Sequence, residues 1–360
     1  MEGMVMINNE FWRGKRVFIT GHTGFKGGWL SLWLQHLGAK VYGYSLEPPT
    51  ETNLFKVARV AENMKSSTIA DIRNTDLLKQ SIANAEPEIV FHLAAQPLVR
   101  YSYDEPVETY SVNVMGTISL LEAVRATKNI RAVVIVTSDK CYENREWLWG
   151  YRENEAMGGY DPYSSSKGCA ELVTAAWRKS FFESENIAMA SARAGNVIGG
   201  GDWASDRLVP DFLRALDAGH TLKVRSPDAV RPWQHVLEPI YGYLLLSERL
   251  YTDGNAFAEG WNFGSNEESA RPVRWIIERL ISSIPGASWQ YDKSQKPHEA
   301  NYLKLDSSKA HSRLCWKPRW NLESALERTV EWHLKWRRGE DMLKFTMSQI
   351  SKYEQSPDVF

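Results

Sequence analysis

The chain has 360 residues, 43% of them hydrophobic and 24% charged, and its 43 basic and 44 acidic side chains leave a formal net charge of −1. These proportions are typical of a folded globular protein of about two domains and exclude a disordered chain. Sequence-independent nucleic-acid binding needs a basic excess, so the charge balance argues against a nucleic-acid partner.

The first half of the chain alternates short apolar strands with helical segments. We predict strands at 16–20, 40–45, 67–70, 88–94, 132–137 and 188–194, and helices at 29–37, from Asn74 or Thr75 onward, and from 106 to about 127. A continuous β-branched and aromatic run such as 16–20 (RVFIT) suits a parallel sheet that is covered on both faces. Strands that alternate with helices form right-handed βαβ units, so the predicted fold is α/β, a Rossmann-type doubly wound parallel sheet.

The second half is less regular. Here the pattern predicts helices at 209–218, 240–249, 273–283 and 322–336, and strands near 222–225 and 261–263. The regular alternation of strands and helices ends near Asn196, and no linker there is long enough to separate two domains widely. We therefore predict an NAD-binding Rossmann domain over 1–195, to which some later segments return, and a smaller, interleaved C-terminal substrate-binding domain over 196–360.

The cysteine spacing and the hydropathy of the sequence indicate where in the cell the protein works. Cys141, Cys169 and Cys315 form no CxxC pair and have no histidine at ligand spacing, so we expect neither a disulfide framework nor a metal site. No apolar run approaches the ~18 residues that a membrane-spanning helix needs, and the first residues do not resemble a signal peptide. The expected location is the cytoplasm, without a membrane partner.

A glycine-rich loop follows the first strand directly. Gly21, Gly24 and Gly27 are spaced GxxGxxG and open a helix. Such glycines permit a tight turn and a close approach of the backbone to a pyrophosphate at the helix N-terminus. The second strand ends at Ser45 and is not followed directly by an arginine that would suit a 2′-phosphate, so the expected cofactor is NAD, with Ser45 near a ribose hydroxyl.

Tyr163 and Lys167 are spaced i, i+4, so on a helix they share one face and can reach a common ligand. A tyrosine that serves as a base near neutrality needs its pKa lowered by about three units from ~10. A neighbouring ammonium group and a cationic nicotinamide act in that direction. We therefore interpret the pair as catalytic.

Several motifs together identify a family. They are Gly21-x-x-Gly24-x-x-Gly27, Asp71-Ile72, 92–95 (HLAA), 113–117 (NVMGT), Ser138 and Tyr163-x-x-x-Lys167. Over about the first 200 residues the chain resembles the extended short-chain dehydrogenase/reductase family. The resemblance, added to the loop argument, implies a cofactor site made of Gly21, Thr23, Gly24, Phe25, Lys26, Gly27, Ser45, Asp71, Ile72, Leu93, Ala94, Ala95, Gln96, Asn113, Thr137, Tyr163 and Lys167. It also implies that Ser138 and Tyr163 bind the hydroxyl that is oxidised.

The residues after Ser138 discriminate between reactions. Asp139 and Lys140 place an acid and an amine beside the expected nicotinamide, and such a pair suits an elimination. The segments 137–144, 150–153, 194–203 and 231–236 resemble nucleotide-sugar 4,6-dehydratases, and the Asp-Lys pair, in place of the Asp-Glu of the dTDP-glucose enzymes, favours the branch that acts on CDP-sugars.

The resemblance implies a mechanism and a substrate. Tyr163 would remove the C4 hydroxyl proton of CDP-glucose as hydride passes to NAD, neutral Lys140 would take the C5 proton, and protonated Asp139 would protonate the departing C6 hydroxyl. Hydride return to C6 would complete a hydro-lyase cycle, with NAD tightly bound and recycled. Asn196, Arg207 and Arg231 are the expected substrate contacts, Arg231 through the diphosphate. The expected product is a deoxysugar precursor of a surface polysaccharide such as lipopolysaccharide O-antigen.

A homodimer or larger homo-oligomer is implied by the resemblance, through helices at about 105–127 and 162–183. The segment 147–151 is equally consistent with a lid and with core packing, whereas His22 and His92 are interpreted as packing residues of the cofactor loop. The alternatives left open are a sugar-nucleotide C4-epimerase, a dTDP- or GDP-sugar dehydratase and, in another class, a non-catalytic NAD-sensing protein.

Overall fold

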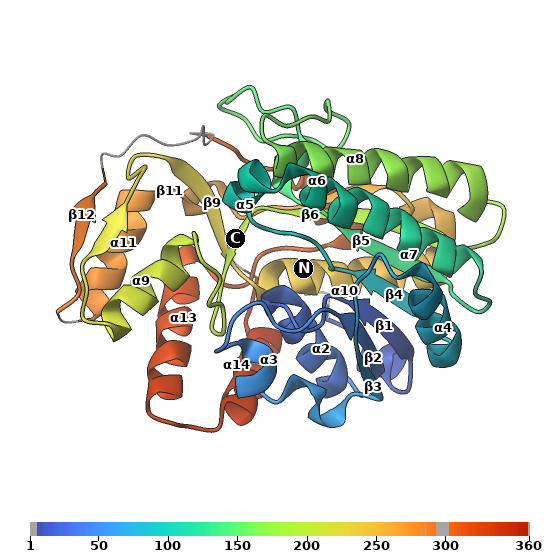
Figure 1. The fold of residues 1–360 in the computed structure, drawn as a ribbon, viewed down its shortest axis with the longest axis horizontal. Coiled ribbons are helices and arrows are strands. Elements are labelled where there is room, and N and C mark those ends of the chain that lie inside the picture. The colour runs from blue at the N-terminus through green and yellow to red at the C-terminus, as the bar shows by residue number, and fades with distance from the viewer. Residues whose placement is uncertain (1–5, 285, 293–301, 359–360) are drawn as a thin grey trace.

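The computed structural model describes residues 6–284, 286–292 and 302–358. Its centre is a seven-stranded sheet in the order β10-β6-β5-β4-β1-β2-β3, in which every neighbouring pair is parallel (Figure 1). The strands are β1 (Arg16–Thr20), β2 (Lys40–Ser45), β3 (Ser66–Ile69), β4 (Ile89–His92), β5 (Ala132–Val136), β6 (Ala188–Ala194) and β10 (Gly260–Phe263). The chain order reverses between β1 and β4, which is where doubly wound sheets bind their ligands.

Helices cover both faces of this sheet, as its apolar strands require. Phe18 and Val90 belong to the core under α4 (Thr75–Ala85), α7 (Gly116–Arg125) and α8 (Pro162–Trp177). The alternate residues Val17 and Ile19 belong to the core shared with α2 (Phe25–His36) and α10 (Leu237–Asp253). Successive side chains of a strand point to opposite faces, so one strand contributes to both cores. In Figure 1, α8 lies at the top and α2 toward the bottom.

The C-terminal half forms a second, smaller body on the left of Figure 1. It contains two small sheets, β11-β9-β7 and β12-β8. Their strands are β7 (Asn196–Ile198), β8 (Leu222–Val224), β9 (Val230–His235), β11 (Ala270–Pro272) and β12 (Trp289–Tyr291), and the helices packed with them are α9 (Leu208–Asp217), α11 (Val273–Ser283) and α13 (Leu322–Arg337). The remaining helices are α1 (Asn9–Trp12), α3 (Leu54–Val57), α5 (Val99–Asp104), α6 (Pro106–Tyr110), α12 (Ser308–Leu314) and α14 (Met342–Gln355).

Two late elements return to the large sheet. The strand β10 pairs with β6, and α10 packs against β5 and β6. The domain boundary at residue 195 stays a prediction. The large sheet contains strands from both sides of that boundary, because its edge strand β10 follows residue 195. The doubly wound α/β fold predicted from the sequence is confirmed.

Some predicted boundaries are wrong for local reasons. The helix expected at 29–37 begins at Phe25, because the glycine loop itself turns into the helix with Gly24 as its cap. The long helix expected from 106 to 127 is interrupted by a π-helical turn at Ser111–Met115, between α6 and α7. Of the two predicted caps of α4, Asn74 is the actual one, since its side chain accepts a hydrogen bond from Leu77 N.

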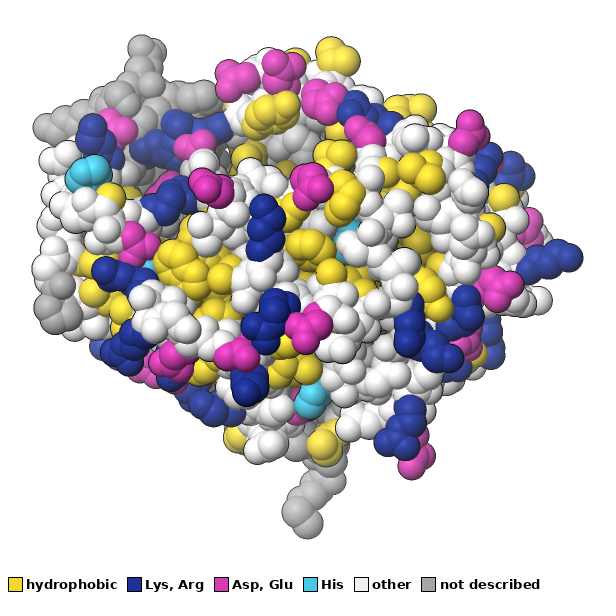
Figure 2. All heavy atoms as spheres, turned by 60° about the horizontal axis from the view of Figure 1, so that its bottom comes forward, with side chains coloured by type: hydrophobic (Ala, Val, Ile, Leu, Met, Phe, Trp, Pro, Cys, Tyr) yellow, Lys and Arg dark blue, Asp and Glu magenta, His cyan; other side chains and the backbone are white. Residues whose placement is uncertain are grey.

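No helix within the described residues is long and apolar enough to cross a membrane. On the face drawn in Figure 2, Lys and Arg side chains are interspersed with Asp and Glu side chains.

Within 147–151, Tyr151 is buried and stacks on Tyr142, whereas Leu148 and Trp149 are exposed, so only part of that segment is core.

Candidate active site

The glycine loop between β1 and α2 has a backbone that only glycine permits. Gly21 has a φ of 78°, and a Cβ atom at Gly27 would lie 2.1 Å from the carbonyl oxygen of Gly21. A Cβ at Gly21 would lie 2.7 Å from the backbone nitrogen of Ala94. Gly24 caps α2 without a side-chain hydrogen bond, so the first backbone N–H groups of the helix face the loop. This is the cradle that a dinucleotide pyrophosphate needs.

The polar side chains at the ends of β2 and β3 form hydrogen bonds with other groups of the protein. Thr23 Oγ1 lies 2.8 Å from Ser45 Oγ and donates to the Leu46 carbonyl oxygen at 2.8 Å. Asp71 accepts hydrogen bonds from the backbone and the guanidinium of Arg73, at 2.6–2.9 Å, and these hydrogen bonds lower its pKa. Arg73 is a residue that the sequence reasoning missed, because no motif spacing marks it.

Asn113 stands behind the loop that follows β4. Its Oδ1 accepts from Gln96 N at 2.8 Å, and its Nδ2 donates to Gln96 O at 3.1 Å and to Ser166 Oγ at 2.9 Å. The side chain therefore connects that loop to α8. Asn113 lies within the π-helical turn, and such turns are frequent at functional sites because they reorient a side chain.

The predicted catalytic residues come from two elements that meet at the end of the sheet. Ser138 follows β5 and caps a short 3₁₀ helix, Asp139–Cys141; its Oγ accepts from Lys140 N at 3.2 Å and donates to Asp139 Oδ1 at 3.0 Å. The helix α8 carries Tyr163 and Lys167 on one face. Its start is fixed by Asp161, which accepts from Ser164 N at 2.9 Å.

Burial sets the electrostatics of these residues. Burial raises the pKa of Tyr163 to about 12, and a hydrogen bond with Ser138 and the charge of Arg207 act against that rise. Burial lowers the pKa of Lys167 to about 8. It also raises the pKa of Asp139, although Lys140, the Ser138 hydroxyl and Arg231 oppose the change. A raised pKa is the direction that the predicted role of Asp139 as an acid requires.

The C-terminal half contributes cations to the same place. Arg207 is ion-paired with Asp202 at 2.8 Å and is close enough to Tyr163 to influence its pKa, and Arg231 of β9 acts on Asp139 in the same way. Asn196 begins β7, directly after Gly195, where a Cβ would lie 3.1 Å from Asp139 Oδ2. The predicted substrate residues Asn196, Arg207 and Arg231 therefore lie near the predicted catalytic residues at the C-terminal end of β5.

Lys26 of the glycine loop also reaches this region. Its Nζ donates to Tyr243 Oη at 3.3 Å. Burial, followed by the charges of Arg207 and Lys167, lowers the pKa of Lys26 to about 7. Two predicted groups lie apart from this centre: Ser45 at the end of β2, and Asp71 with Ile72 after β3. They stay predictions for the adenosine half of a cofactor.

The two histidines of the motifs are packing residues, as predicted. His92 lies between Thr20 Oγ1, at 2.7 Å from Nδ1, and Thr117 Oγ1, at 3.2 Å from Nε2. Burial lowers its pKa to about 3, so it stays neutral. Nε2 of His22 lies 2.7 Å from Ser67 Oγ, and burial lowers the pKa of His22 to about 4.

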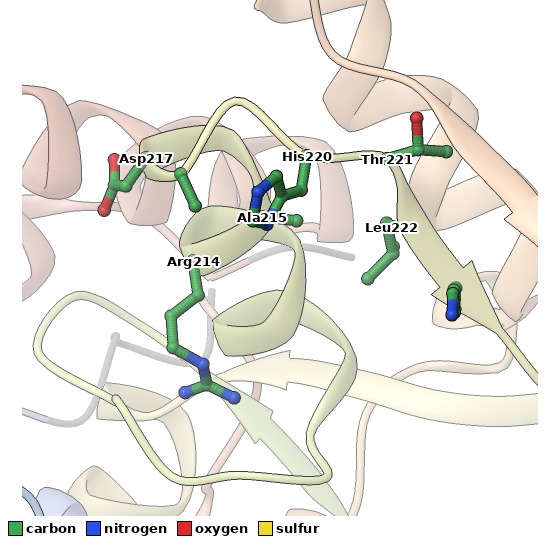
Figure 3. Close-up of a pocket in the computed structure, with 8 residues that line it drawn as sticks. Arg214, Ala215, Asp217, His220, Thr221 and Leu222 are labelled. Atoms are coloured by element: carbon green, nitrogen blue, oxygen red, sulfur yellow. The ribbon is translucent and has the colours of Figure 1, made fainter.

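A hollow of about 600 Å³ lies elsewhere, between α9 and β8 (Figure 3). Its lining includes Arg214, His220 and Lys223. Asp217 at its rim is ion-paired with His333 at 3.0 Å. None of the predicted site residues lines this hollow, so it is separate from the candidate active site.

Comparisons with known proteins found related sequences and related structures. The family model described as GDP-mannose 4,6 dehydratase matches residues 18–329. The CDP-glucose 4,6-dehydratase of Salmonella typhimurium is 58% identical over 97% of this chain and 98% of its own length. The dTDP-glucose 4,6-dehydratase of the same organism is 26% identical over 89% of this chain and 92% of its own length. Among solved structures, DesIV, a dTDP-glucose 4,6-dehydratase from Streptomyces venezuelae with NAD bound, has a TM-score of 0.78 at 24% identity and covers 91% of this chain and 99% of its own.

Proposed function

The chain belongs to the GDP-mannose 4,6-dehydratase family, and from this premise we propose that it is a hydro-lyase that converts CDP-glucose to CDP-4-keto-6-deoxyglucose with NAD as a recycled cofactor. The choice of CDP-glucose is supported by the relative that is 58% identical over nearly the whole chain. Ser138, Asp139, Lys140, Tyr163 and Lys167 are the proposed catalytic residues.

One observation carries the proposal of an elimination. Asp139 is a buried carboxyl with a raised pKa, held 3.0 Å from the hydroxyl of Ser138 at the end of β5. Oxidation and reduction at C4, which is all that a C4-epimerase performs, need no such acid. A buried acid beside the oxidation machinery is what loss of a hydroxyl from C6 requires. An NAD-sensing protein would need none of these groups.

Each of the proposed catalytic and binding residues has its own role in the reaction. NAD, when bound in the glycine cradle, supplies the hydride acceptor at C4 and the hydride donor at C6. Tyr163, assisted by Ser138 and Lys167, takes the proton of the C4 hydroxyl. The new ketone acidifies the C5 hydrogen, which Lys140 removes as Asp139 protonates the departing C6 hydroxyl. A proton returns to C5 when hydride reaches C6. Asn196, Arg207 and Arg231 hold the nucleotide sugar.

The proposal is tested with purified protein and a panel of CDP-, dTDP-, UDP- and GDP-glucose. We expect a 4-keto sugar, seen by its absorbance in alkali, from CDP-glucose at a rate at least about 100-fold above the other donors, a discrimination of about 2.7 kcal/mol. Formation of the C4 epimer in place of a ketone would support the epimerase alternative. No turnover of any donor would refute an enzymatic function.

The proposal extends to assembly and location. Val107 of α6 is 80% exposed, and Met115 and Leu172 are 53% and 61% exposed on the neighbouring π-helical turn and on α8. Large apolar side chains exposed together on adjacent helices suit a helix-to-helix interface. We assign this face, formed by α6, α7 and α8 at the top of Figure 1, to a homodimer of a cytoplasmic enzyme.

Charge on this face should disrupt the dimer. We expect the double variant Val107→Glu, Leu172→Glu to sediment as a monomer at concentrations where the wild-type protein is a dimer, because each substitution places an unpaired charge in an apolar interface. Analytical ultracentrifugation measures this. Tyr291→Glu, at an exposed position on β12, is the matched control and should sediment like the wild type. A double variant that remains dimeric would place the interface elsewhere.

A further inference from the structure

Glu171 is a buried acid of α8 for which the reaction has no direct use. It lies one helical turn after Lys167 and two turns after Tyr163, so the three side chains follow one face of the helix. Only 4% of Glu171 is exposed. A buried carboxylate is costly unless it is paired and hydrogen-bonded, so its partners indicate what it does.

Four hydrogen bonds to this carboxylate come from three residues, one directly after β5 and two on β6. Thr137, after β5, donates to Oε1 at 2.5 Å, and Ser191 of β6 donates to Oε2 at 2.6 Å. Arg193 of β6 donates Nε to Oε1 at 2.9 Å and Nη2 to Oε2 at 2.8 Å. Burial would raise the pKa of Glu171, but the guanidinium and the hydrogen bonds outweigh burial and lower it. Glu171 is therefore ionised.

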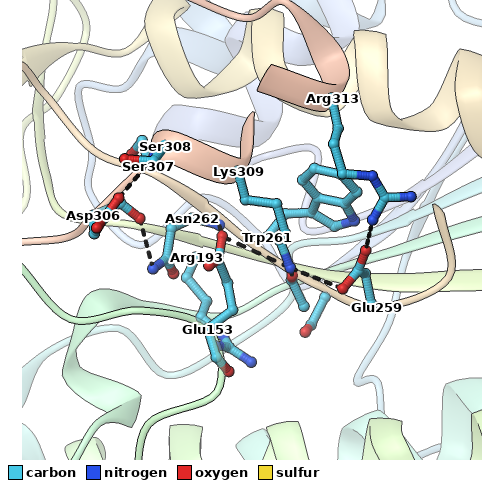
Figure 4. Close-up of polar contacts among 12 residues, drawn as sticks. Glu153, Arg193, Glu259, Trp261, Asn262, Asp306, Ser307, Ser308, Lys309 and Arg313 are labelled. Atoms are coloured by element: carbon cyan, nitrogen blue, oxygen red, sulfur yellow. Dashed lines mark hydrogen bonds and ion pairs between the residues drawn. The ribbon is translucent and has the colours of Figure 1, made fainter. Parts of the chain in front are cut away.

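Arg193 continues the hydrogen-bond network toward the loop that follows the candidate active site. Its Nη1 donates to Tyr142 Oη at 2.6 Å and to the Glu153 carbonyl oxygen at 3.1 Å. Tyr142 Oη donates to Asn262 Oδ1 at 2.7 Å. Asn262 N in turn donates to Glu153 Oε1 at 3.0 Å, and Figure 4 shows these residues beside Arg193. The ion pair thus links α8 to β5, β6, β10 and the 142–153 loop.

We propose that Glu171 is a positioning residue for the C4 oxidation, which, through Thr137, holds the end of β5 that carries Ser138 in register with Tyr163, and which presents its negative charge to Lys167. This inference rests on the proposed function. The hydroxyl of Thr137 is turned to Glu171, and Ser138 is the next residue, so the 2.5 Å hydrogen bond constrains the backbone that presents Ser138. A small displacement of a catalytic group lowers the rate steeply.

The electrostatic part concerns the titratable groups that act on Lys167. Burial lowers the pKa of Lys167, whereas Glu171 and the Cys141 thiol raise it. The charge of Lys167 in turn lowers the pKa of Lys26, in the first turn of α2, and of neutral His92 at the end of β4. Because Glu171 carries the largest opposing influence, removal of its charge should release a proton from Lys167 at lower pH.

The first test compares two hydroxyls that donate to the same carboxylate. Thr137→Val removes the donor next to Ser138, and Ser191→Ala removes the donor on β6. We expect Thr137→Val to lower kcat about tenfold with KM and the affinity for NAD within about twofold, and Ser191→Ala to change kcat less than about twofold. NAD affinity is measured by quenching of tryptophan fluorescence. Equal losses in both variants, or a loss confined to NAD affinity, would overturn the positioning role of the Thr137 contact.

The second test removes the charge. In Glu171→Gln combined with Arg193→Met neither partner is left as an unpaired ion, so the double variant avoids the penalty of a buried lone charge. We expect the alkaline limb of its kcat–pH profile to lie lower than that of the wild type by about 0.5 pH unit or more. An unmoved limb would overturn the electrostatic part. If the double variant does not fold, the pair of hydroxyl variants decides alone. Wild-type protein inactive on every nucleotide sugar would refute the proposed function, whereas active wild type with unchanged variants refutes only this inference.

Discussion

Replacement of Tyr163 by phenylalanine is expected to lower kcat by about 1,000-fold, because a positioned proton acceptor contributes roughly 10²–10⁴ to the rate of such a step. The ring of Tyr163 is buried and the substitution removes only its hydroxyl, so the fold and NAD binding should remain. The pKa of Tyr163 is raised by burial to about 12, so its ionised fraction grows as the pH rises. We therefore expect wild-type activity to increase with pH until Lys167, with its pKa near 8, loses its charge.

The measurement is a single turnover with CDP-glucose, followed by the absorbance of NADH over a range of pH. The control is Tyr160→Phe, at a tyrosine that is 80% exposed three residues earlier in the chain, and its rate should stay within about twofold of the wild type. A Tyr163→Phe protein that keeps a tenth of the wild-type rate would assign the proton transfer to another group.

The second large effect is expected at Asp139. Asparagine keeps the shape of Asp139 and its contact with Ser138 but cannot give a proton to a leaving hydroxyl. We expect Asp139→Asn to lower the rate of dehydration about 100- to 1,000-fold while C4 oxidation continues, so that NADH accumulates on the enzyme. Stopped-flow absorbance of NADH, together with mass spectrometry of the sugar product, measures both steps.

Lys140 provides the matched comparison, since it is the neighbour with the other proposed role. Lys140→Met should also stop dehydration after C4 oxidation, but in addition it should abolish exchange of the C5 hydrogen with deuterated solvent, which Asp139→Asn should retain. Normal C5 exchange in Lys140→Met would show that Lys140 is not the base. Rapid dehydration by Asp139→Asn would show that Asp139 is not the acid.

Features with a local cause could be predicted from the sequence. The RVFIT strand, the glycine spacing after it and the Tyr-x-x-x-Lys pair each depend on residues within one turn or one strand. The strand and its glycine loop lie at the switch point of the sheet, where the chain order reverses between β1 and β4. The charge of Lys167 reaches Lys26, which follows the glycine loop, so the glycine motif and the Tyr-x-x-x-Lys motif lie near each other.

Features with a tertiary cause were not predictable. The strand at β10 was expected, but its place at the edge of the large sheet depends on its pairing with β6, about 70 residues earlier. Glu171 has the appearance of an ordinary polar helix residue until Arg193, Thr137 and Ser191 are brought around it. Arg73 likewise acquires its partners, Asp71 and Glu108, only in the folded chain.

The late return of β10 and α10 has a consequence for synthesis on the ribosome. Until β10 emerges, the edge of β6 has unpaired backbone groups, and until α10 emerges, an apolar face of β5 and β6 has no cover. An open edge and an uncovered face are the parts of a nascent chain that aggregate. The seven-stranded sheet is therefore complete only when roughly three quarters of the chain has been made, and we expect the nascent chain to need protection from aggregation until then.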